Sequence, residues 1–468
     1  MSPKYEILNV WHVGAWNRNV GDWAMAFHMH RMLDRQARER GAALKFYMVD
    51  SQRTLFHPAL IDQMNEEADL VLIGGGGLIF LRPEDESKSG WSFNTTTAEV
   101  DRIKKPIVVY GVGYNRFPYD PNSFPEITGR HLQHLQKRSE IFSARDVGTK
   151  DALVGVFGCQ AKGVDVVPDA GLALHDRAID IPALRAGRKG LIGLNFAGDR
   201  PHYRFPREKD WPIFQKTVKK AMLEYARDGW QIMFLPHLIG IDSDMYESFA
   251  EGFPKGSIFS THKELSYLYP PAGEMLYSHI PFFTNLFRKP DLTLGMRGHT
   301  CIISFGAGTP FMPLGAHRKL GDFSADLDVP LDYSLGLPES AETMSKTMRR
   351  CLADAKYKKA IRDSVPRQVK KIEVFNERVL DVFVPKPKKK LAKIKEKPRQ
   401  PLKRNTSPFG RTARGTRRRP MPCSICASTA ASISSSFINA TRRFSKRSAT
   451  RPRASSRATP GKSWAKAT

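Results

Sequence analysis

The sequence predicts an α/β protein with two Rossmann-like domains, a cleft between them, and a disordered basic C-terminal tail. Three observations lead to this prediction. Short apolar runs alternate with helical patterns over the first two thirds of the chain, which is typical of βαβ units around parallel sheets. This alternation stops in a linker-like stretch at residues 179–188 and then starts again. After Val384 large apolar side chains become rare, so the last segment cannot bury enough surface to fold.

The first domain is predicted at residues 1–180. Residues 8–13 are expected to form its first strand. Asp22–Arg40 is expected to form its first helix, because apolar residues recur there at helical spacing and Gly41 follows. The further strands expected before Asp169 are the runs LKFYMVD, DLVLIGGGG, PIVVYGVG, IFSARD and VDVVPD.

The second domain is predicted at residues 189–340. Its expected helices are Glu208–Asp228 and one that begins at Thr300. Residues 341–384 have the pattern of closing helices. The strands expected in this domain are the runs GLIGLNF, WQIMFLP, DLTLGM and PFMPLG.

The positive charge of the chain is concentrated in residues 385–468. This tail holds 24 Lys and Arg against one acid, Glu396, and so carries +23 of the formal net charge of +27. The +4 left on residues 1–384 gives no electrostatic reason to expect nucleic-acid binding by the folded body. The tail is interpreted as a weak contact for anionic surfaces or nucleic acid, as a solvated linker, or as an out-of-frame coding end.

Cysteine spacing and hydropathy exclude several classes of protein. The five cysteines are scattered except for Cys423 and Cys426, and no second pair or nearby His completes a zinc site or a disulfide framework. No apolar run approaches the roughly 20 residues of a membrane span, and the first residues lack the pattern of a signal peptide. We therefore expect a cytoplasmic protein without a transmembrane segment or a bound metal.

The strongest indication of chemistry is the run DLTLGMRGHTCIISFGAGTP at residues 291–310. An apolar strand ends at Met296, Arg297 and His299 follow, and a helix begins near Thr300. A helix N-terminus has unpaired N–H groups, and a guanidinium beside it suits a phosphate or carboxylate. In the alternative interpretation, Arg297 pairs with a carboxylate of the protein and His299 caps the helix.

Two glycine-rich turns are further candidates for ligand binding. In Trp11–Phe27 a strand gives way to a Gly- and Asn-rich loop and then to a helix. There, Gly14 and Gly21 could equally supply tight backbone geometry, and Asp22 could cap the helix. Gly74–Gly77 follow a buried strand and allow close approach of a ligand or of the neighbouring domain. They lack the Lys and Ser/Thr of a P-loop, which excludes that class of nucleotide triphosphatase.

Taken in order, these motifs resemble the polysaccharide pyruvyl transferase family. The resemblance covers about residues 10–323, which is most of the body and none of the tail. The matching motifs are Asn19-Val20-Gly21-Asp22, the run DLVLIGGGGLI, Arg145-Asp146, Pro168-Asp169 and the run GMRGHTCIISFGAGTPFMPLGAHRKLGDF.

The resemblance implies a fold similar to the GT-B glycosyltransferases and a role in exopolysaccharide biosynthesis. It implies phosphoenolpyruvate as donor, without a further cofactor, and a sugar or glycan-lipid as acceptor. The second domain would bind the donor and the first domain the acceptor. The donor would contact Arg297, His299 and Lys319. The residues expected to face the cleft are Asn19, Gly21, Asp22, Gly74, Gly75, Gly76, Gly77 and Arg145. This chain departs from the family at Gly298, where a larger apolar residue is common.

The residue types fit the implied reaction. Ketal formation requires protonation of the methylene carbon of the enol, and a protonated histidine beside a phosphate is a suitable acid. His299 is the first candidate for this acid, and His237 in FLPHLIGIDSD is the second. A lone histidine after a proline is more often structural. Asp242 and Asp244 follow closely and are expected to be solvated.

Two other functions compete with this interpretation. A GT-B glycosyltransferase that uses a nucleotide sugar would need a carboxylate for the ribose, and Glu264 and Glu274 are too indefinite to serve. A non-catalytic binding protein would act through the basic tail. A glycosyltransferase is distinguished from a pyruvyl transferase by which donor it consumes. A binding protein that acts through the tail is distinguished by the loss of its function when the tail is removed.

We predict that deletion of residues 385–468 leaves folding and turnover unchanged, because the tail has too few apolar residues to join a core. Turnover of the truncated and full-length proteins is compared under one assay. Any nucleic-acid binding by the full-length protein should weaken steeply with salt. A truncated protein that fails to fold or loses turnover would contradict the prediction.

Overall fold

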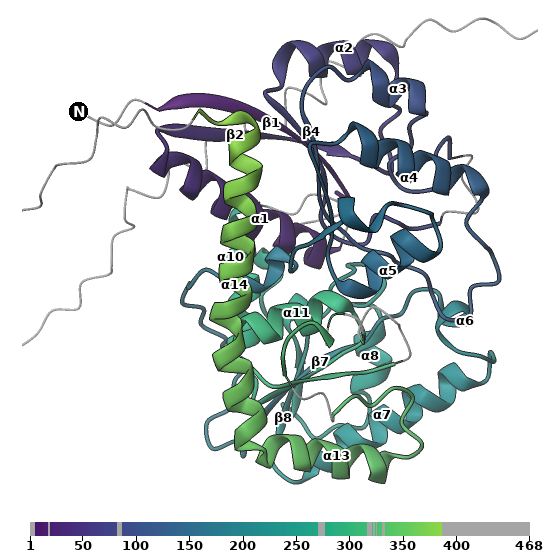
Figure 1. The fold of residues 1–468 in the computed structure, drawn as a ribbon. Helices are drawn as coiled ribbons and strands as arrows, with labels where there is room; N and C mark the ends of the chain where they lie inside the picture. Colours follow the sequence, from purple (N-terminus) through teal and green to yellow (C-terminus); the bar gives the residue numbers. More distant parts are fainter. Residues whose placement is uncertain are drawn as a thin grey trace, which may run out of the picture. The chain divides into compact units, whose positions relative to one another are not determined.

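The computed structural model describes residues 5–16, 19–81, 87–269, 277–315, 321, 323, 325–329 and 333–385. These residues form two α/β units, each built on a parallel sheet (Figure 1). The predicted fold class, with two Rossmann-like sheets, is confirmed. Lys319, the pair Cys423 and Cys426, and the predicted tail beyond Pro385 lie outside the described residues.

The first sheet has six parallel strands in the order β2-β1-β3-β4-β5-β6. Every residue of β3 and β4 is buried, as expected for central strands covered on both faces. All six runs expected in this part of the chain form strands. The strands are β1 (Glu6–Gly14), β2 (Ala42–Asp50), β3 (Leu70–Gly74), β4 (Ile107–Val112), β5 (Ile141–Ala144) and β6 (Asp165–Val166). The α-helices of this unit are α1 (Val20–Glu39), α2 (Pro58–Glu67), α3 (Thr97–Arg102), α4 (Glu126–Arg138) and α5 (Val147–Gly155).

The second sheet has five parallel strands in the order β11-β10-β7-β8-β9. Its strands are β7 (Leu191–Asn195), β8 (Gln231–Phe234), β9 (Ile258–Ser260), β10 (Leu292–Gly295) and β11 (Phe311–Pro313). Strand β9 was not predicted, because an edge strand of three residues is too short to show a pattern. The α-helices are α6 (Pro201–Arg204), α7 (Asp210–Arg227), α8 (Met245–Ala250), α9 (Thr261–Glu264), α10 (Ile280–Asn285) and α11 (Gly298–Gly306).

Each sheet has one point where the strand order reverses. In the first sheet this switch point lies between β1 and β3, and in the second it lies between β7 and β10. Ligands of open parallel sheets bind outside the carboxyl ends of the strands at such a point. The loops that follow β1, β3 and β10 carry the three motifs singled out from the sequence. The topology therefore places all three motifs at ligand-binding positions.

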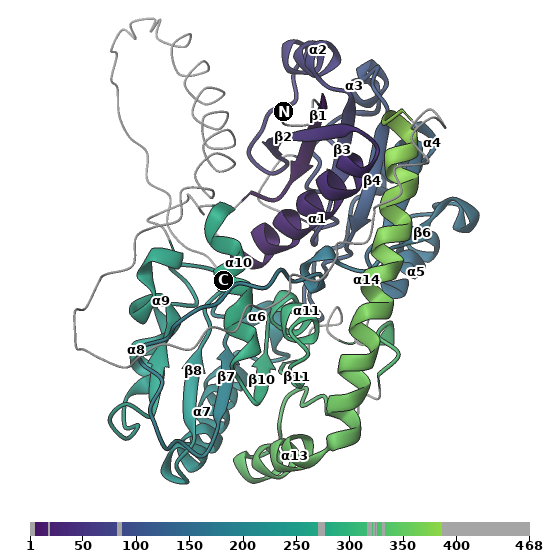
Figure 2. The same cartoon turned by 90° about the vertical axis from the view of Figure 1, so that its left-hand side faces the viewer.

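Two helices after the second sheet close the fold. They are α13 (Ala341–Ala353) and α14 (Ala355–Phe383), and the long α14 runs along both sheets (Figure 2). Near its start, Tyr357 donates its O–H to the carbonyl of Phe311 in β11 at 2.7 Å. Near its end, Asn376 accepts the O–H of Tyr110 in β4 at 2.7 Å. The final helix thus bonds to a strand of each sheet.

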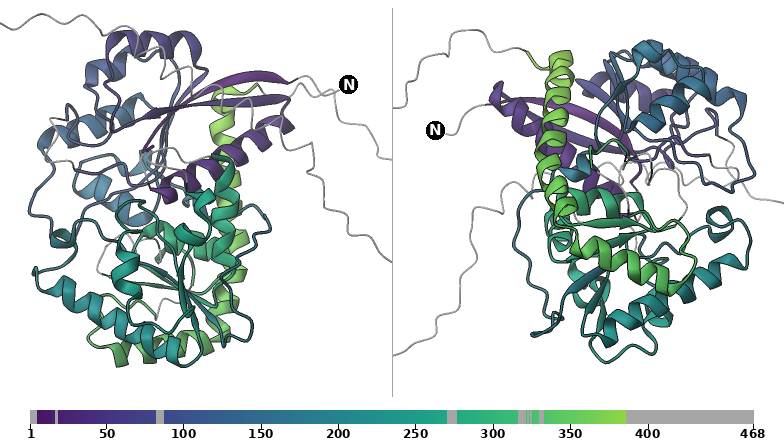
Figure 3. Two further views of the ribbon diagram at one scale, coloured as in Figure 1. Left: turned by 180° about the vertical axis from the view of Figure 1, so that it is seen from behind. Right: turned by 60° about the horizontal axis from the view of Figure 1, so that its bottom comes forward.

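Helix α1 packs beside α14 (Figure 3). Polar contacts join the two: Gln36 donates to Glu377 Oε1 at 2.7 Å, and Arg40 donates to Asp381 Oδ1 at 2.8 Å. The opposite face of α1 carries a buried apolar stripe against the first sheet. Because α1 begins directly after the first switch point, its packing fixes the position of that loop.

We predict that Asn376→Ala destabilises the protein by about 1–3 kcal/mol, because it leaves the buried Tyr110 O–H and Gln36 Oε1 without their partner. The midpoint of urea unfolding should fall. The control is Val374→Ala on the exposed side of the same helix, where about 0.5 kcal/mol or less is expected. Equal midpoints for the two variants would contradict the prediction.

Candidate active site

His299 lies between two carboxylates of the first α/β unit. Strand β10 ends at Gly295 and α11 begins at Gly298, so His299 is in the first turn of the helix. Its Nε2 lies 3.3 Å from Asp169 Oδ2, and its Nδ1 lies 3.6 Å from Asp22 Oδ1. Only 8% of the His299 side chain is exposed. Each ring nitrogen therefore faces a carboxylate in a site almost closed to solvent.

Gly21 allows His299 to approach α1 this closely. A Cβ at Gly21 would lie 2.5 Å from both the Cβ and the Nδ1 of His299. The side chain of Asn19 caps α1 by accepting from the Gly21 N–H at 3.1 Å, and its Nδ2 donates to Asp22 Oδ2 at 2.9 Å. The structure thus brings three predicted loop residues, Asn19, Gly21 and Asp22, to His299.

Asp169 and Arg145 form the buried side of this site. Asp169 is fully buried, and its Oδ2 faces His299 Nε2 at 3.3 Å and Arg145 Nη1 at 3.7 Å. Its Oδ1 accepts the N–H of Gly171 at 2.8 Å. Burial by itself raises the pKa of Asp169, but His299, Arg145 and the Gly171 N–H together lower it below its ordinary value. Asp169 is therefore ionised, and its Oδ2 faces both the imidazole of His299 and the guanidinium of Arg145.

The glycine run after β3 packs against the protein itself. Gly74 and Gly75 have φ of +150° and +74°, and a Cβ on them would lie 2.1 Å from the Tyr110 carbonyl oxygen and 2.1 Å from Met25 Cε. A Cβ on Gly76 would lie 3.0 Å from Asp22 Oδ1. A Cβ on Gly77 would lie 2.9 Å from the Cβ of Asn115. The four glycines thus pack closely against their own unit and not against the neighbouring domain, their role toward a ligand stays a prediction, and a Val at Gly75 would disturb packing as well as any ligand.

A buried series of hydrogen bonds between side chains ends at the Gly74 carbonyl and fixes the backbone of this glycine loop. Since a carbonyl can only accept, His12 Nε2 donates to Gly74 O at 2.9 Å. His12 Nδ1 must then accept from His30 Nε2 at 2.6 Å, and His30 Nδ1 accepts from the Tyr277 O–H at 2.7 Å. Burial, partly opposed by the Gly74 bond, lowers the pKa of His12 to about 4, and burial together with the nearby His12 lowers the pKa of His30 well below 6.5. Both histidines are thus neutral and fix the Gly74 carbonyl.

Arg297 is bonded to carboxylates of its own unit. Its Nε and Nη2 donate to the two oxygens of Asp242 at 2.6 Å each, and Nη2 also donates to Asp199 Oδ1 at 2.8 Å. Arg204 donates to the same Asp199 oxygen at 2.9 Å. The prediction that Asp242 is solvated is wrong: its side chain is fully buried, and it also accepts the N–H groups of residues 237 and 238. The predicted donor-binding role of Arg297 stays a prediction, and the pairing shows that Arg297 also stabilises its own loop.

His237 is enclosed in the core of the second unit. It is fully buried, its Nε2 lies 3.2 Å from Thr300 Oγ1, and its ring packs edge-on against Phe283 and Phe287. Burial, with the nearby Arg297 and His299, lowers its pKa well below 6.5. Its carbonyl accepts the N–H of Val20 at 2.9 Å. The ring of His237 is therefore neutral and packed within the second unit, while its backbone carbonyl bonds to the first unit. Its catalytic role stays a prediction that this geometry does not favour.

Several residues of the candidate site were not predicted from the sequence. Asp169 was recognised within a motif and given no role. Its position after a strand, at the carboxyl edge of the sheet, could have indicated a site residue, because ligands of such sheets bind at that edge. The pairing of Arg297 with Asp199 and Asp242 joins loops far apart in the sequence, which no local pattern reveals. Lys319, predicted to bind the donor, lies outside the described residues.

The part of the chain that the structure describes has neither a cluster of metal-ligating side chains nor a membrane-spanning helix. Its His, Cys, Asp and Glu side chains form no group of three or more arranged to hold a metal ion. None of its helices is both long and apolar enough to cross a membrane. The expected cytoplasmic location stays a prediction.

One family model matches about two thirds of the chain. The family model described as polysaccharide pyruvyl transferase matches residues 4–318, which contain His299, Asp22, Asp169 and Arg145. No curated protein matches the chain in sequence.

The similar solved structures establish the fold class. A protein described as UDP-N-acetylglucosamine 2-epimerase, from Listeria monocytogenes, is 12% identical with a TM-score of 0.50, covering 80% of this chain and 94% of its own. Another UDP-N-acetylglucosamine 2-epimerase is 11% identical with a TM-score of 0.50, covering 80% of this chain and 96% of its own. At such identities the likeness shows the fold alone, and that fold is GT-B-like.

We predict that Asp242→Asn destabilises the protein by about 3–5 kcal/mol, the usual cost of removing one partner of a buried ion pair. Arg297 would keep only Asp199 as an anionic partner, with 11% of its side chain exposed. Thermal unfolding of this variant is compared with that of Asp244→Asn, an exposed carboxylate two residues away. If both variants unfold at the wild-type temperature, the network does not stabilise the loop.

Proposed function

The chain belongs to the polysaccharide pyruvyl transferase family, and we propose that it transfers the pyruvyl group of phosphoenolpyruvate to a sugar of a glycan as a ketal, with release of phosphate. The observation that carries this proposal is the position of His299, between Asp22 and Asp169 and at the start of α11. A titratable ring, a helix N-terminus and a buried arginine meet there, as a small anionic donor requires.

The reaction has three parts that need protein groups. A proton adds to the methylene carbon of the enol, which makes the central carbon electrophilic. One sugar hydroxyl adds to that carbon, and a second hydroxyl replaces the phosphate, so that two C–O bonds form and one breaks. The two hydroxyls lose two protons, one of which balances the proton gained by the methyl group while the other leaves with phosphate. The protein must therefore supply one acid, one proton acceptor and an anion site.

We assign the acid to His299. An imidazole can take a proton at one nitrogen and release one from the other, and both of its nitrogens face carboxylates here. Asp169 is fully buried and fixed by Gly171, so it orients the ring as the aspartate of a catalytic triad does. Asp22 lies on the other side, where 12% of its side chain is exposed. Its carboxylate is the group best placed to exchange protons with the acceptor hydroxyls.

We assign the donor anion to the start of α11 together with Arg145. No side chain caps this helix, and the first N–H groups of a helix have no partner within it. Arg145 is buried and reaches the same Asp169 oxygen that faces His299. Arg297 contributes through Nη1, which makes no hydrogen bond to the described residues, while its other nitrogens stay with Asp242. These groups would offset the charge that develops on the leaving phosphate.

We predict that His299→Gln lowers turnover by about 10²- to 10⁴-fold, the usual range for loss of one positioned acid or base. The assay is steady-state phosphate release from phosphoenolpyruvate with a panel of glycan acceptors. Asp169→Asn should lower turnover in the same direction, because it removes the charge that orients the ring. The matched control is His202→Gln, an exposed histidine in α6, which should keep wild-type kinetics.

The kinetic pattern separates the roles of His299. A binding role would appear mainly as a raised KM for phosphoenolpyruvate, whereas an acid role lowers kcat. A folded His299→Gln protein with wild-type kinetics would contradict the proposal. Consumption of a nucleotide sugar in place of phosphoenolpyruvate would support the glycosyltransferase alternative instead.

A further inference from the structure

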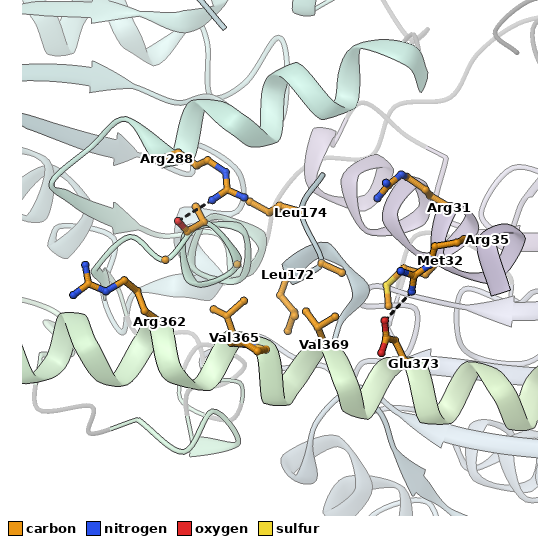
Figure 4. A pocket seen from close by; sticks show the side chains of 15 residues that line it. Arg31, Met32, Arg35, Leu172, Leu174, Arg288, Arg362, Val365, Val369 and Glu373 are labelled. Atoms are coloured by element: carbon orange, nitrogen blue, oxygen red, sulfur yellow. Dashed lines mark hydrogen bonds and ion pairs between the residues drawn. The ribbon is translucent and has the colours of Figure 1, made fainter. Parts of the chain in front are cut away.

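A second pocket, of about 440 Å³, lies away from the predicted site residues, none of which lines it. Its walls come from α1, the turn at Ala170–Leu172, the end of α11 and α14 (Figure 4). The volume falls within the range of pockets that bind small molecules. Two of these elements also serve the candidate active site, since Asp169 caps the turn and His299 begins α11.

The lining of this pocket is strongly basic. Four arginines contribute to it, Arg31, Arg35, Arg288 and Arg362, against one lining acid, Glu373. Glu373 pairs with Arg35 at 2.7 Å, and Arg288 pairs at 2.7 Å with Asp176, which is not among the lining residues. Arg31 and Arg362 have no ion pair with any residue that the structure describes. At least two positive charges of the pocket thus have no counter-charge among the residues that the structure describes.

Arg31 lies in an environment that favours an anionic partner. Burial, followed by the charges of Arg35 and Arg177, lowers its pKa below the ordinary value for arginine. Arg31 and Arg362 are both exposed, so solvent screens part of this repulsion, and because a guanidinium stays protonated in proteins, a bound anion would relieve what remains. Phosphate groups suit this purpose, because a guanidinium donates two parallel hydrogen bonds to them.

The arginines are separated by an apolar floor. Arg31 and Arg288 extend toward one another from opposite sides, with Leu174 between them, and Leu172, Val365 and Val369 lie below (Figure 4). A bare polyanion would leave this apolar surface exposed to water. A ligand with a flat ring and attached phosphates would cover the floor and reach the arginines.

We propose that this pocket binds a nucleotide, with its phosphates on the arginines and its base over the apolar floor. The proposal does not depend on the reaction proposed for the His299 site. It concerns the charges and shape of the second pocket alone.

The test uses the full-length protein and ADP as the probe, with binding measured by calorimetry at low salt. The double variant Arg31→Gln, Arg362→Gln should bind ADP about tenfold more weakly or worse, because two charge-assisted contacts are lost. The matched control is Arg53→Gln, Arg227→Gln, which removes two exposed arginines outside the pocket and should bind like wild type. Binding of ADP to the basic tail would be equal in all three proteins and would not produce this difference.

A second variant and two other probes test the geometry. Val369→Asp places a carboxylate on the floor among the arginines and should also abolish binding. Adenosine lacks the phosphates and pyrophosphate lacks the base, so each should bind more weakly than ADP. Equal binding of either probe, or equal ADP binding by the double variant and its control, would overturn the proposal. Loss of ADP binding in His299→Gln would overturn it as well, since the nucleotide would then occupy the active site.

Discussion

The candidate site depends on the contact between His299 and the carboxylates of the first α/β unit. His299 belongs to the second unit, and Asp22 and Asp169 belong to the first, so the site exists only where the two units meet. Several neighbouring features make this contact possible. Gly21 has no side chain to block the ring, the Val20 N–H bonds to the carbonyl of His237, and α14 bonds to a strand of each sheet. A change in any of these features would move a carboxylate away from the imidazole of His299 and would lower the activity proposed for this site.

The pairing of Arg297 shows why the start of α11 can carry a buried cation. A buried guanidinium is costly unless its donors are satisfied, and the fork of Arg297 is held by Asp242 and Asp199. Asp242 in turn accepts two backbone N–H groups in the loop after β8. The network therefore ties together the loops after β7, β8 and β10. A loss of activity in an Arg297 variant would reflect this structural role as well as any contact with a donor.

Local patterns in the sequence were enough to predict most of the fold. The buried strands are continuous apolar runs, and the loops after β1, β3 and β10 were identified as candidate sites from their glycines and polar residues. Strand β9 has only three residues and could not be recognised. The solvated state expected for Asp242 was wrong because its partner, Arg297, is 55 positions away. The contact between Asp169 and His299 likewise depends on how the two units meet, which no local pattern encodes.

The candidate active site and the second pocket differ in how the positive charges of their arginines are balanced by carboxylates. In the candidate active site each cation already has a carboxylate, since Arg145 faces Asp169 and Arg297 holds Asp242. In the proposed reaction an anionic donor would use the hydrogen-bond donors that the carboxylates leave, on the first N–H groups of α11, the guanidinium of Arg145 and Nη1 of Arg297. In the proposed reaction this balance of charge would favour the release of phosphate after each turnover. In the second pocket the exposed Arg31 and Arg362 have no carboxylate among the described residues, so a phosphate bound there would not compete with one. The turn at Ala170–Leu172 and helix α11 serve both regions. The positive charges are paired with carboxylates at the candidate active site, which suits turnover. In the second pocket two of them are unpaired among the described residues, which suits retention of a ligand.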